Sequence, residues 1–364
     1  MMNSRITQAR LFEAVTPLSR PIADSTHSID KIAFLVLELT TAGGVVGESY
    51  LLSFDYSPHG IRGAIQDLLP LLEGMEVWQT GKLIQTAAQK AEYFGFTGLQ
   101  KQAAALAEVA MWDAWARTLE TPLWKLFGTN HTRVPVYGSG GWLSYSCDEL
   151  IDEVTDYKKR GFQAVKIKVG STEAEEDIRR VALVREALGP EIKIMIDANQ
   201  GCDLPEAIHL AEALHPYNIH WFEEPLDHQD FRGFKTLRDK TGISLAMGER
   251  EYGTTPLREL IALNAIDLWQ PDLIRIGGVT AWRAAAALAD SYHIPVLPHY
   301  YKDYDVPLLC GISRPYGAES FDWIDPIIDS KMRIEDGFAY PREAPGWGFR
   351  FLREHLTEIL SVDY

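Results

Sequence analysis

Hydrophobic and polar residues alternate along short segments of this chain, and longer segments with helical spacing lie between them. Near the N-terminus the pattern predicts strands at residues 5–18 and 31–51, followed by helices at residues 61–74 and 99–120. The glycine pair Gly43-Gly44 provides a turn within the second strand segment. Pro70 is expected to kink or end the first helix, because proline has no N–H to donate. These features together predict an α+β unit.

From about residue 133 the pattern changes to regular alternation of strand-like and amphipathic segments. Strands are expected at residues 134–140, 164–170, 192–200, 219–226, 244–250, 266–278, 294–301 and 315–323. Amphipathic helical segments lie between them, for example residues 147–162, 172–189 and 279–293. Eight strands that alternate with helices predict an α/β fold in which a parallel sheet closes into a β/α barrel.

The same pattern suggests three parts of the chain. We expect an α+β unit over residues 1–130, the barrel over residues 131–325, and a loop-rich tail over residues 326–364. The tail is expected to pack back on the N-terminal region. No low-complexity linker separates the three parts.

Three acidic residues end consecutive strand segments at equal spacing. Asp197, Glu223 and Glu249 are separated by 26 residues each, since 223 − 197 and 249 − 223 are both 26. A period of this size corresponds to one strand, one helix and two loops, so we expect the carboxylates at the same height on successive strands. Three converging carboxylates predict a site for a hard divalent cation, and we expect Mg²⁺. For any one of the three acids, the alternative to binding a cation is that it is a solvated residue at the end of a strand.

Alternation within the strands predicts which side chains face the barrel mouth, because residues i and i+2 point the same way. Lys166 and Lys168 are expected to point inward together. Asn199 is expected to face the same way as Asp197, and Glu223 is preferred to Glu224 as the cation ligand. Two adjacent lysines repel each other by roughly 4 kcal/mol at an effective dielectric near 20. We therefore expect a lysine pKa lowered toward the working pH, suited to a base.

Three further polar residues end the last strand segments. Asp272 and His299 follow the sixth and seventh, where the aspartate is expected to fix the tautomer of the imidazole. Glu319 lies on the eighth and, if protonated, would donate a hydrogen bond to a developing oxyanion. The alternatives are a structural histidine and a surface glutamate.

Composition excludes several classes of partner. The chain has 364 residues and a formal net charge of −16, which disfavours binding to nucleic acid or to an anionic membrane surface. Its three cysteines, Cys147, Cys202 and Cys310, have no C-x-x-C spacing and predict free thiols in a reducing compartment. No signal-peptide pattern and no apolar run of membrane-spanning length is present. A cytoplasmic protein is expected.

With these residues in these positions, the chain resembles the enolase superfamily, and within it the mandelate racemase subgroup. The resemblance covers nearly the whole length and includes the segments TAGGVVGESYL, GFQAVKIKVG, IDANQ, WFEEP, GER, PDLIRIGGVTAW and PHYY. It implies a capping domain formed by the N-terminal region and the tail, and a modified (β/α)7β barrel. It also implies one Mg²⁺ per subunit, a small carboxylate substrate, and a homo-oligomer.

The resemblance also implies roles for the residues above. Asp197, Glu223 and Glu249 match the metal ligands of the subgroup, and Asp272 and His299 match its dyad. Lys166, Lys168 and Glu319 match its lysine pair and its electrophilic glutamate. We expect the α-proton of a 2-hydroxy carboxylate to be removed, with the charge spread onto an enediolate.

The residues alone do not choose between two outcomes of that chemistry. Reprotonation from the opposite side, by Lys168 or His299, gives racemisation or epimerisation, which we place first. Loss of a β-hydroxyl with His299 as the acid gives dehydration of an acid sugar to a 2-keto-3-deoxy acid. A non-catalytic protein that binds acid sugars is a third alternative. Ser139, Asn199, Lys166 and Trp142 are expected to contact the substrate. The polar loops at residues 23–31 and 51–58 favour a polyhydroxylated acid over mandelate.

Overall fold

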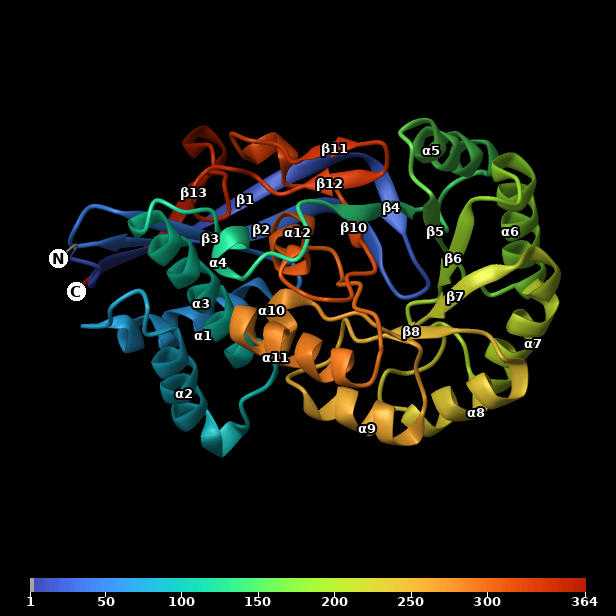
Figure 1. Cartoon of the computed structure of the whole chain (residues 1–364), viewed down its shortest axis with the longest axis horizontal. Coiled ribbons are helices and arrows are strands. Elements are labelled where there is room, and N and C mark those ends of the chain that lie inside the picture. The colour runs from blue at the N-terminus through green and yellow to red at the C-terminus, as the bar shows by residue number, and fades with distance from the viewer. Residues whose placement is uncertain (1–2) are drawn as a thin grey trace.

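The N-terminal region and the tail of the chain share one antiparallel sheet. The computed structural model describes residues 3–364. Its four-stranded sheet has the order β13-β1-β2-β3 and consists of β1 (Ile6–Ala23), β2 (Ser28–Thr41), β3 (Val46–Leu52) and β13 (Thr357–Asp363). The predicted glycine turn joins β2 to β3, with Gly44 at φ +77°. As expected, the tail returns to the N-terminal region, because β13 pairs with β1 (Figure 1).

Helices cover one face of this sheet. They are α1 (Pro58–Leu68), α2 (Thr80–Lys90), α3 (Gly98–Thr118) and the short α4 (Leu123–Leu126). The first helix ends just before Pro70, as predicted, and continues as a 3-10 turn over Leu69–Leu72. The long helix α3 packs closely on β3, where a Cβ atom at Gly47 would lie 2.4 Å from the Ala110 carbonyl oxygen. Only glycine permits this approach of helix and strand.

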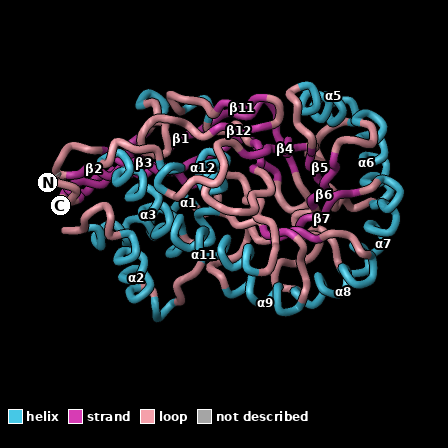
Figure 2. The backbone as a smooth tube through the Cα atoms, viewed as in Figure 1, coloured by secondary structure: helices cyan, strands magenta, loops and turns pink. Residues whose placement is uncertain are grey.

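The barrel is built from parallel strands with helices outside them. Its strands are β4 (Val134–Gly140), β5 (Ala164–Lys168), β6 (Lys193–Asp197), β7 (Ile219–Glu223), β8 (Leu245–Met247), β9 (Leu268–Trp269) and β10 (Ala318–Ser320). Its helices are α5 (Cys147–Lys159), α6 (Ala174–Leu188), α7 (Leu204–Leu214), α8 (Phe231–Thr241), α9 (Thr255–Leu263), α10 (Leu273–Ile276), α11 (Gly278–Ser291) and α12 (Lys302–Cys310). Strands β4 to β9 pair in chain order, and β10 pairs with β4. Figure 2 shows the helices as an outer layer around the strands. The predicted (β/α)7β barrel with a capping domain is confirmed.

The seventh barrel position is not a regular strand, contrary to expectation. Residues 294–301 pair with their neighbours only through single bridges, from Val296 to Trp269 and from His299 to Asp272. Pro295 and Pro298 cannot donate backbone hydrogen bonds, so a continuous ladder is impossible here. A bridge from Val296 to Pro315 leads on toward β10 and completes the ring.

One layer of inward side chains fills the barrel below its mouth. This cluster consists of Tyr137, Met195, Trp221, Ala246, Leu268 and Leu297, all of them buried. Tyr137, Met195 and Trp221 each lie two residues before a candidate site residue on the same strand, namely Ser139, Asp197 and Glu223. Since side chains two apart face the same way, the candidate residues form the next layer upward.

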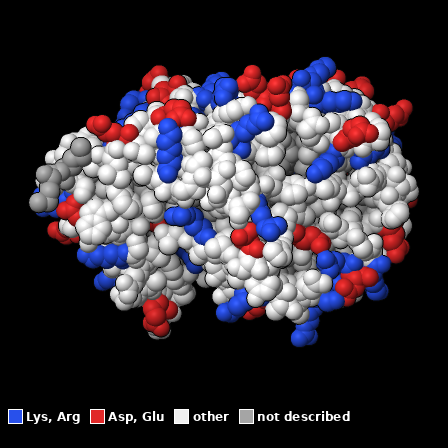
Figure 3. Space-filling model, viewed as in Figure 1, with Lys and Arg blue, Asp and Glu red and all other residues white. Residues whose placement is uncertain are grey.

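The remaining short strands, β11 (Arg333–Glu335) and β12 (Phe338–Tyr340), form a hairpin that pairs with the start of β4. On the face of the molecule in Figure 3, acidic and basic side chains are interspersed, with no extended surface of one sign. No helix within residues 3–364 is long and apolar enough to cross a membrane.

A buried carboxylate joins the capping domain to the barrel. Glu108 of α3 is fully buried and accepts hydrogen bonds from the backbone N–H groups of Val279 and Thr280, at 2.7 and 3.1 Å. These N–H groups belong to the first turn of α11, where helix N–H groups have no partner within the helix. The Thr280 hydroxyl adds a third bond, at 2.6 Å. The capping domain therefore supplies the N-terminal cap of a barrel helix.

Candidate active site

The lysines and the first two acids lie in register across three strands. Lys168 pairs with Asp197 on the next strand, and Asp197 pairs with Glu223 on the strand after that. Lys168 Nζ lies 2.5 Å from Asp197 Oδ2, and Lys166 Nζ lies 2.5 Å from Glu223 Oε1. All four side chains are buried. The alternation rule thus placed these groups correctly on the inner face.

Glu249 does not lie at the same height as the other two acids. The register pairs Glu223 with Ala246, so Glu249 is three residues further along its own segment. Strand β8 has only three residues, and Gly248 after it turns the chain at φ +139°. Glu249 nevertheless lines the same pocket as Lys166 and Lys168, and its charge adds to the repulsion that Glu223 experiences. Burial first, and then the neighbouring carboxylates, raise the pKa of Glu223 to about 7.

The donor chemistry of these three acids fits a hard divalent cation. Each contributes buried carboxylate oxygens, which Mg²⁺ prefers. A fourth oxygen, Oδ1 of Asn199, is buried nearby without a hydrogen-bond partner. In residues 3–364, no three histidine, cysteine or acidic side chains form a preformed ligand set. Asp197 and Glu223 instead point their oxygens at the lysines, so a cation would compete with Lys166 and Lys168 for them.

The expectation of a lowered lysine pKa is wrong for the protein's own groups. Burial opposes the charge on Lys166, but Glu223 and Glu319 outweigh burial and raise its pKa well above the usual range. The pKa of Lys168 is also raised, since Asp197 outweighs burial and the repulsion from Lys166. Each lysine has a carboxylate oxygen 2.5 Å from its Nζ, and this attraction outweighs the repulsion between the two lysines.

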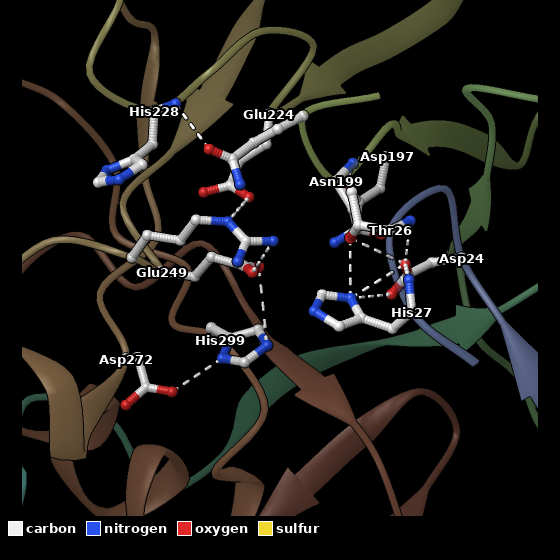
Figure 4. A network of polar contacts seen from close by, with 12 residues as sticks. Asp24, Thr26, His27, Asp197, Asn199, Glu224, His228, Glu249, Asp272 and His299 are labelled. Atoms are coloured by element: carbon white, nitrogen blue, oxygen red, sulfur yellow. Dashed lines mark hydrogen bonds and ion pairs between the residues drawn. The ribbon is translucent and has the colours of Figure 1, made fainter. Parts of the chain in front are cut away.

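The predicted dyad is formed on the opposite side of the site. His299 Nδ1 lies 2.9 Å from Asp272 Oδ2 (Figure 4). The other oxygen of Asp272 accepts the N–H groups of Ile274 and Arg275, at 2.9 and 2.8 Å, as the N-cap of α10. This fixes the aspartate and leaves Nε2 of His299 directed toward Glu249, 3.6 Å away. Burial disfavours the imidazolium, but Glu249 and Asp272 outweigh it and raise the pKa of His299 to about 9.

Glu319 is buried rather than a surface residue, but it is not held protonated. Its Oε1 lies 2.7 Å from Lys166 Nζ, and its Oε2 accepts the Tyr300 N–H at 2.8 Å. Burial opposes ionisation, yet Lys166 and His299 outweigh it and lower the pKa of Glu319. The expected neutral hydrogen-bond donor is therefore not what these neighbours favour. Ser139 lies on the adjacent strand with its hydroxyl buried beside Glu319, whose pKa it helps to lower.

A pocket of about 630 Å³, partly open to solvent, brings these groups together. Lys166, Lys168, Asn199, Glu249, His299 and Glu319 line it, as does Trp142, which was expected to border the substrate. Trp142 stacks on Trp323 with ring centroids 6.2 Å apart, which gives the pocket an aromatic wall. The capping domain closes the pocket with residues of the two polar loops, among them Asp24, His27, Phe54 and Tyr56.

Asp24 orders the first of these loops. Its carboxylate accepts the backbone N–H groups of Thr26 and His27, at 2.8 and 2.7 Å, and lies 3.1 Å from His27 Nδ1. Burial opposes its charge, but the His27 contact and the nearby Lys168 outweigh burial and lower the pKa of Asp24 to about 2. In Figure 4 the His27 ring points into the space that Glu249 and His299 face from the other side.

Sequence reasoning missed several residues that hold the acids in place. Gln270 donates to Glu223 Oε2 at 2.6 Å. Arg250 donates to Glu224 at 2.7 Å and lies 3.4 Å from Glu249, so it bridges two acids. Glu224, which strand alternation ranked below Glu223 as a cation ligand, is fully buried, with φ +35°. The adjacent polar residues in WFEEP, GER and WQPD could have indicated these supporting contacts, since polar side chains are uncommon at buried strand ends unless they have polar partners.

A buried acid behind the dyad gives a prediction about stability. Both oxygens of Asp305, in α12, are buried without a hydrogen-bond partner. Burial first, and then Asp272 and Glu319, raise its pKa well above 3.8. A carboxyl group whose pKa is higher in the folded than in the unfolded protein destabilises the fold increasingly as pH rises above the unfolded pKa. We expect Asp305→Asn to raise the melting temperature at pH 7 by a few degrees. The gain should shrink as pH falls toward 4, as followed by thermal unfolding.

Asp303 on the same helix is the matched control. It pairs with buried Arg342 at 2.6 Å, so Asp303→Asn leaves that guanidinium without its partner and should lower the melting temperature. A stability loss in Asp305→Asn at pH 7 would contradict the raised pKa of Asp305.

Comparison with known proteins gives a consistent result over both parts of the chain. Residues 6–128 match the family described as "Mandelate racemase / muconate lactonizing enzyme, N-terminal domain". Residues 149–355 match the family described as "Enolase C-terminal domain-like".

Individual relatives cover nearly the whole chain. L-talarate/galactarate dehydratase of Salmonella typhimurium is 29% identical over 352 residues, covering 95% of this chain and 88% of the relative. The 3,6-anhydro-alpha-L-galactonate cycloisomerase of Streptomyces coelicolor is 29% identical over 346 residues, covering 94% and 96%. Among solved structures, L-talarate dehydratase from Polaromonas sp. JS666, complexed with Mg and L-glucarate, superposes with a TM-score of 0.92. It is 30% identical and covers 99% of both chains.

Proposed function

The chain belongs to the mandelate racemase/muconate lactonizing enzyme subgroup of the enolase superfamily, and on that premise we propose that it is an Mg²⁺-dependent dehydratase of acid sugars. The reaction would convert a polyhydroxylated acid to a 2-keto-3-deoxy acid. The relatives are named as dehydratases and a cycloisomerase of sugar-derived acids, and L-talarate dehydratase binds Mg and L-glucarate. Racemisation, which the sequence placed first, becomes the second candidate.

Two proton-transfer groups border the same pocket, as both dehydration and racemisation require, and the polar loop that closes this pocket is the observation that carries dehydration. Lys168 ends β5, and His299, oriented by Asp272, closes the seventh position of the barrel. A substrate between them has one group to remove its α-proton and another to protonate its leaving group. The polar loop that carries Asp24 and His27 suits a substrate with several hydroxyl groups.

Each residue would have a separate role in the reaction. Lys166 would hold the substrate carboxylate by donating to one of its oxygens, and the ionised Glu319 beside it would keep the lysine charged. Lys168, in its neutral form, takes the α-proton, and the electron pair moves into an enediolate. His299, as the imidazolium, donates its Nε2 proton to the β-hydroxyl, which leaves as water. The resulting enol tautomerises to the 2-keto-3-deoxy acid. The raised pKa of His299, about 9, favours the charged form that this step needs.

A bound Mg²⁺ would be held by Asp197, Glu223 and Glu249, and would supply positive charge that stabilises the enediolate and lowers the pKa of Lys168. Asn199, with its free buried oxygen, and Ser139 would contact the substrate beside it. Trp142 would form the wall against which the carbon chain lies.

The proposal is tested by incubating the protein and Mg²⁺ with a library of acid sugars and measuring the release of 2-keto acid. We expect at least one acid sugar to give a 2-keto-3-deoxy product. Exchange of the α-proton with deuterated water and inversion, without a keto product, would favour racemisation instead. A protein that binds acid sugars without any exchange would be a binding protein on the same fold.

A further inference from the structure

Six side chains that are or can become cationic border the pocket, and five of them have an acidic partner. The five pairs are Lys166 with Glu223, Lys168 with Asp197, Arg250 with Glu224, His27 with Asp24 and His299 with Asp272. Arg275 is the sixth. Within residues 3–364 no carboxylate oxygen lies within 4.0 Å of its guanidinium. Its one side-chain hydrogen bond goes to the backbone carbonyl of Glu249, at 3.1 Å.

Arg275 also lies where the pocket continues beyond Asp272 and His299. A second cavity of about 750 Å³ adjoins the pocket, and His299 and Arg275 line both of them. The lysines line only the first, whereas the second is bordered by polar residues of the capping domain such as Ser53, Ser57 and Gln102. A substrate whose carboxylate lies at Lys166, with its α-carbon between Lys168 and His299, would extend its remaining carbons past His299 toward Arg275.

We propose that Arg275 binds a second carboxylate at the far end of the substrate, so that the preferred substrates are aldaric acids, which carry a carboxylate at both ends. This inference rests on the proposed function and narrows its substrate class. A guanidinium presents two parallel N–H donors that match a carboxylate, and such charge-assisted pairs are strong where water is partly excluded. An aldonic acid ends in a neutral hydroxymethyl group and would leave this cation without an anion. The two aldarates in the name of the Salmonella relative, and the glucarate bound by the Polaromonas one, have this character.

The test uses pairs of acids that differ only at the far carbon, for example galactarate and galactonate. Affinity is measured by calorimetry with Mg²⁺ present, and turnover by release of 2-keto acid. We expect the aldarate of the preferred pair to be favoured about a hundredfold by the wild-type protein, and Arg275→Met to remove most of that preference, mainly through KM. Arg275→Lys should keep part of it, since the charge remains while the paired donors are lost. Arg258→Met, an exposed arginine on α9, is the matched control and should keep the ratio.

Several outcomes would overturn the inference. Equal affinity for both members of every pair in the wild-type protein would do so, even if 2-keto acid is released. A stronger preference for an aldonate with a terminal phosphate would assign a phosphate to Arg275. If Arg275→Met lowers Mg²⁺ affinity and the affinities for both acids alike, the arginine only positions the Glu249 segment. An aldarate preference that depends on Arg275 without any turnover would sustain this inference and reject the proposed dehydratase.

Discussion

Replacing His299 with asparagine is expected to reduce the release of 2-keto acid by about a thousandfold, because in the proposed mechanism the leaving hydroxyl loses its proton donor. Asparagine keeps an amide near the position of Nδ1, so Asp272 retains a partner for the oxygen that now lies 2.9 Å from the ring. The other carboxylate oxygen still accepts two N–H groups of α10, which keeps the aspartate in place. The substitution therefore removes the acid with little change in its support. Single-turnover release of keto acid measures the effect.

The two proton-transfer groups can be separated in the same variant. Lys168 is untouched by His299→Asn, so exchange of the substrate α-proton with deuterated water should continue while product release stops. Asp272→Asn is expected to have a milder effect, since the imidazole remains and Glu249 still raises its pKa, although the contribution of Asp272 is lost. Undiminished keto-acid release by His299→Asn would assign the leaving-group proton to another residue.

Replacing Glu223 with glutamine is expected to weaken Mg²⁺ binding by at least about a hundredfold and to abolish turnover at millimolar Mg²⁺. The neutral amide removes the buried charge that lies in register with Asp197 and leaves only one oxygen to offer. Calorimetric titration of Mg²⁺ measures the affinity directly. Chelation of the wild-type protein should likewise stop activity, and added Mg²⁺ should restore it.

Glu251→Gln is the control for this experiment. Glu251 is also buried and lies only two residues after Glu249, but its partner is His228, at 2.7 Å, and it borders an outer groove. Its removal should leave Mg²⁺ affinity within a few-fold of the wild type. Unchanged Mg²⁺ affinity in Glu223→Gln would reject Glu223 as a ligand.

Strand periodicity predicted the inner face of the barrel because it is a local property of the backbone. Alternation placed Lys166 with Lys168 on one face. By the same rule Trp221 shares the face of Glu223, to which its indole donates at 3.3 Å. Equal sequence spacing did not predict the height of Glu249. Spacing counts residues through helices and loops, whereas register depends on where each short strand begins and ends.

The charge states of the site could not be predicted from neighbouring residues in the sequence. The sequence shows Lys166 and Lys168 side by side, but the partners that decide their pKa values, Glu223 and Asp197, come from other strands. Gln270 and Asp305 likewise act through distant neighbours. Such contacts form only when the barrel closes, so the sequence of one local segment does not reveal them.

The Glu108 contact has a consequence for how this protein can be taken apart or recombined. The barrel helix α11 depends on a carboxylate that the first 130 residues of the chain supply, and Glu108 in turn is buried beneath the start of that helix. Neither part is a module with an interchangeable surface. A chimera that grafts a relative's capping domain onto this barrel, in order to exchange specificity loops, must carry an acid at this position and a matching helix start, or it will lose the barrel along with the loops.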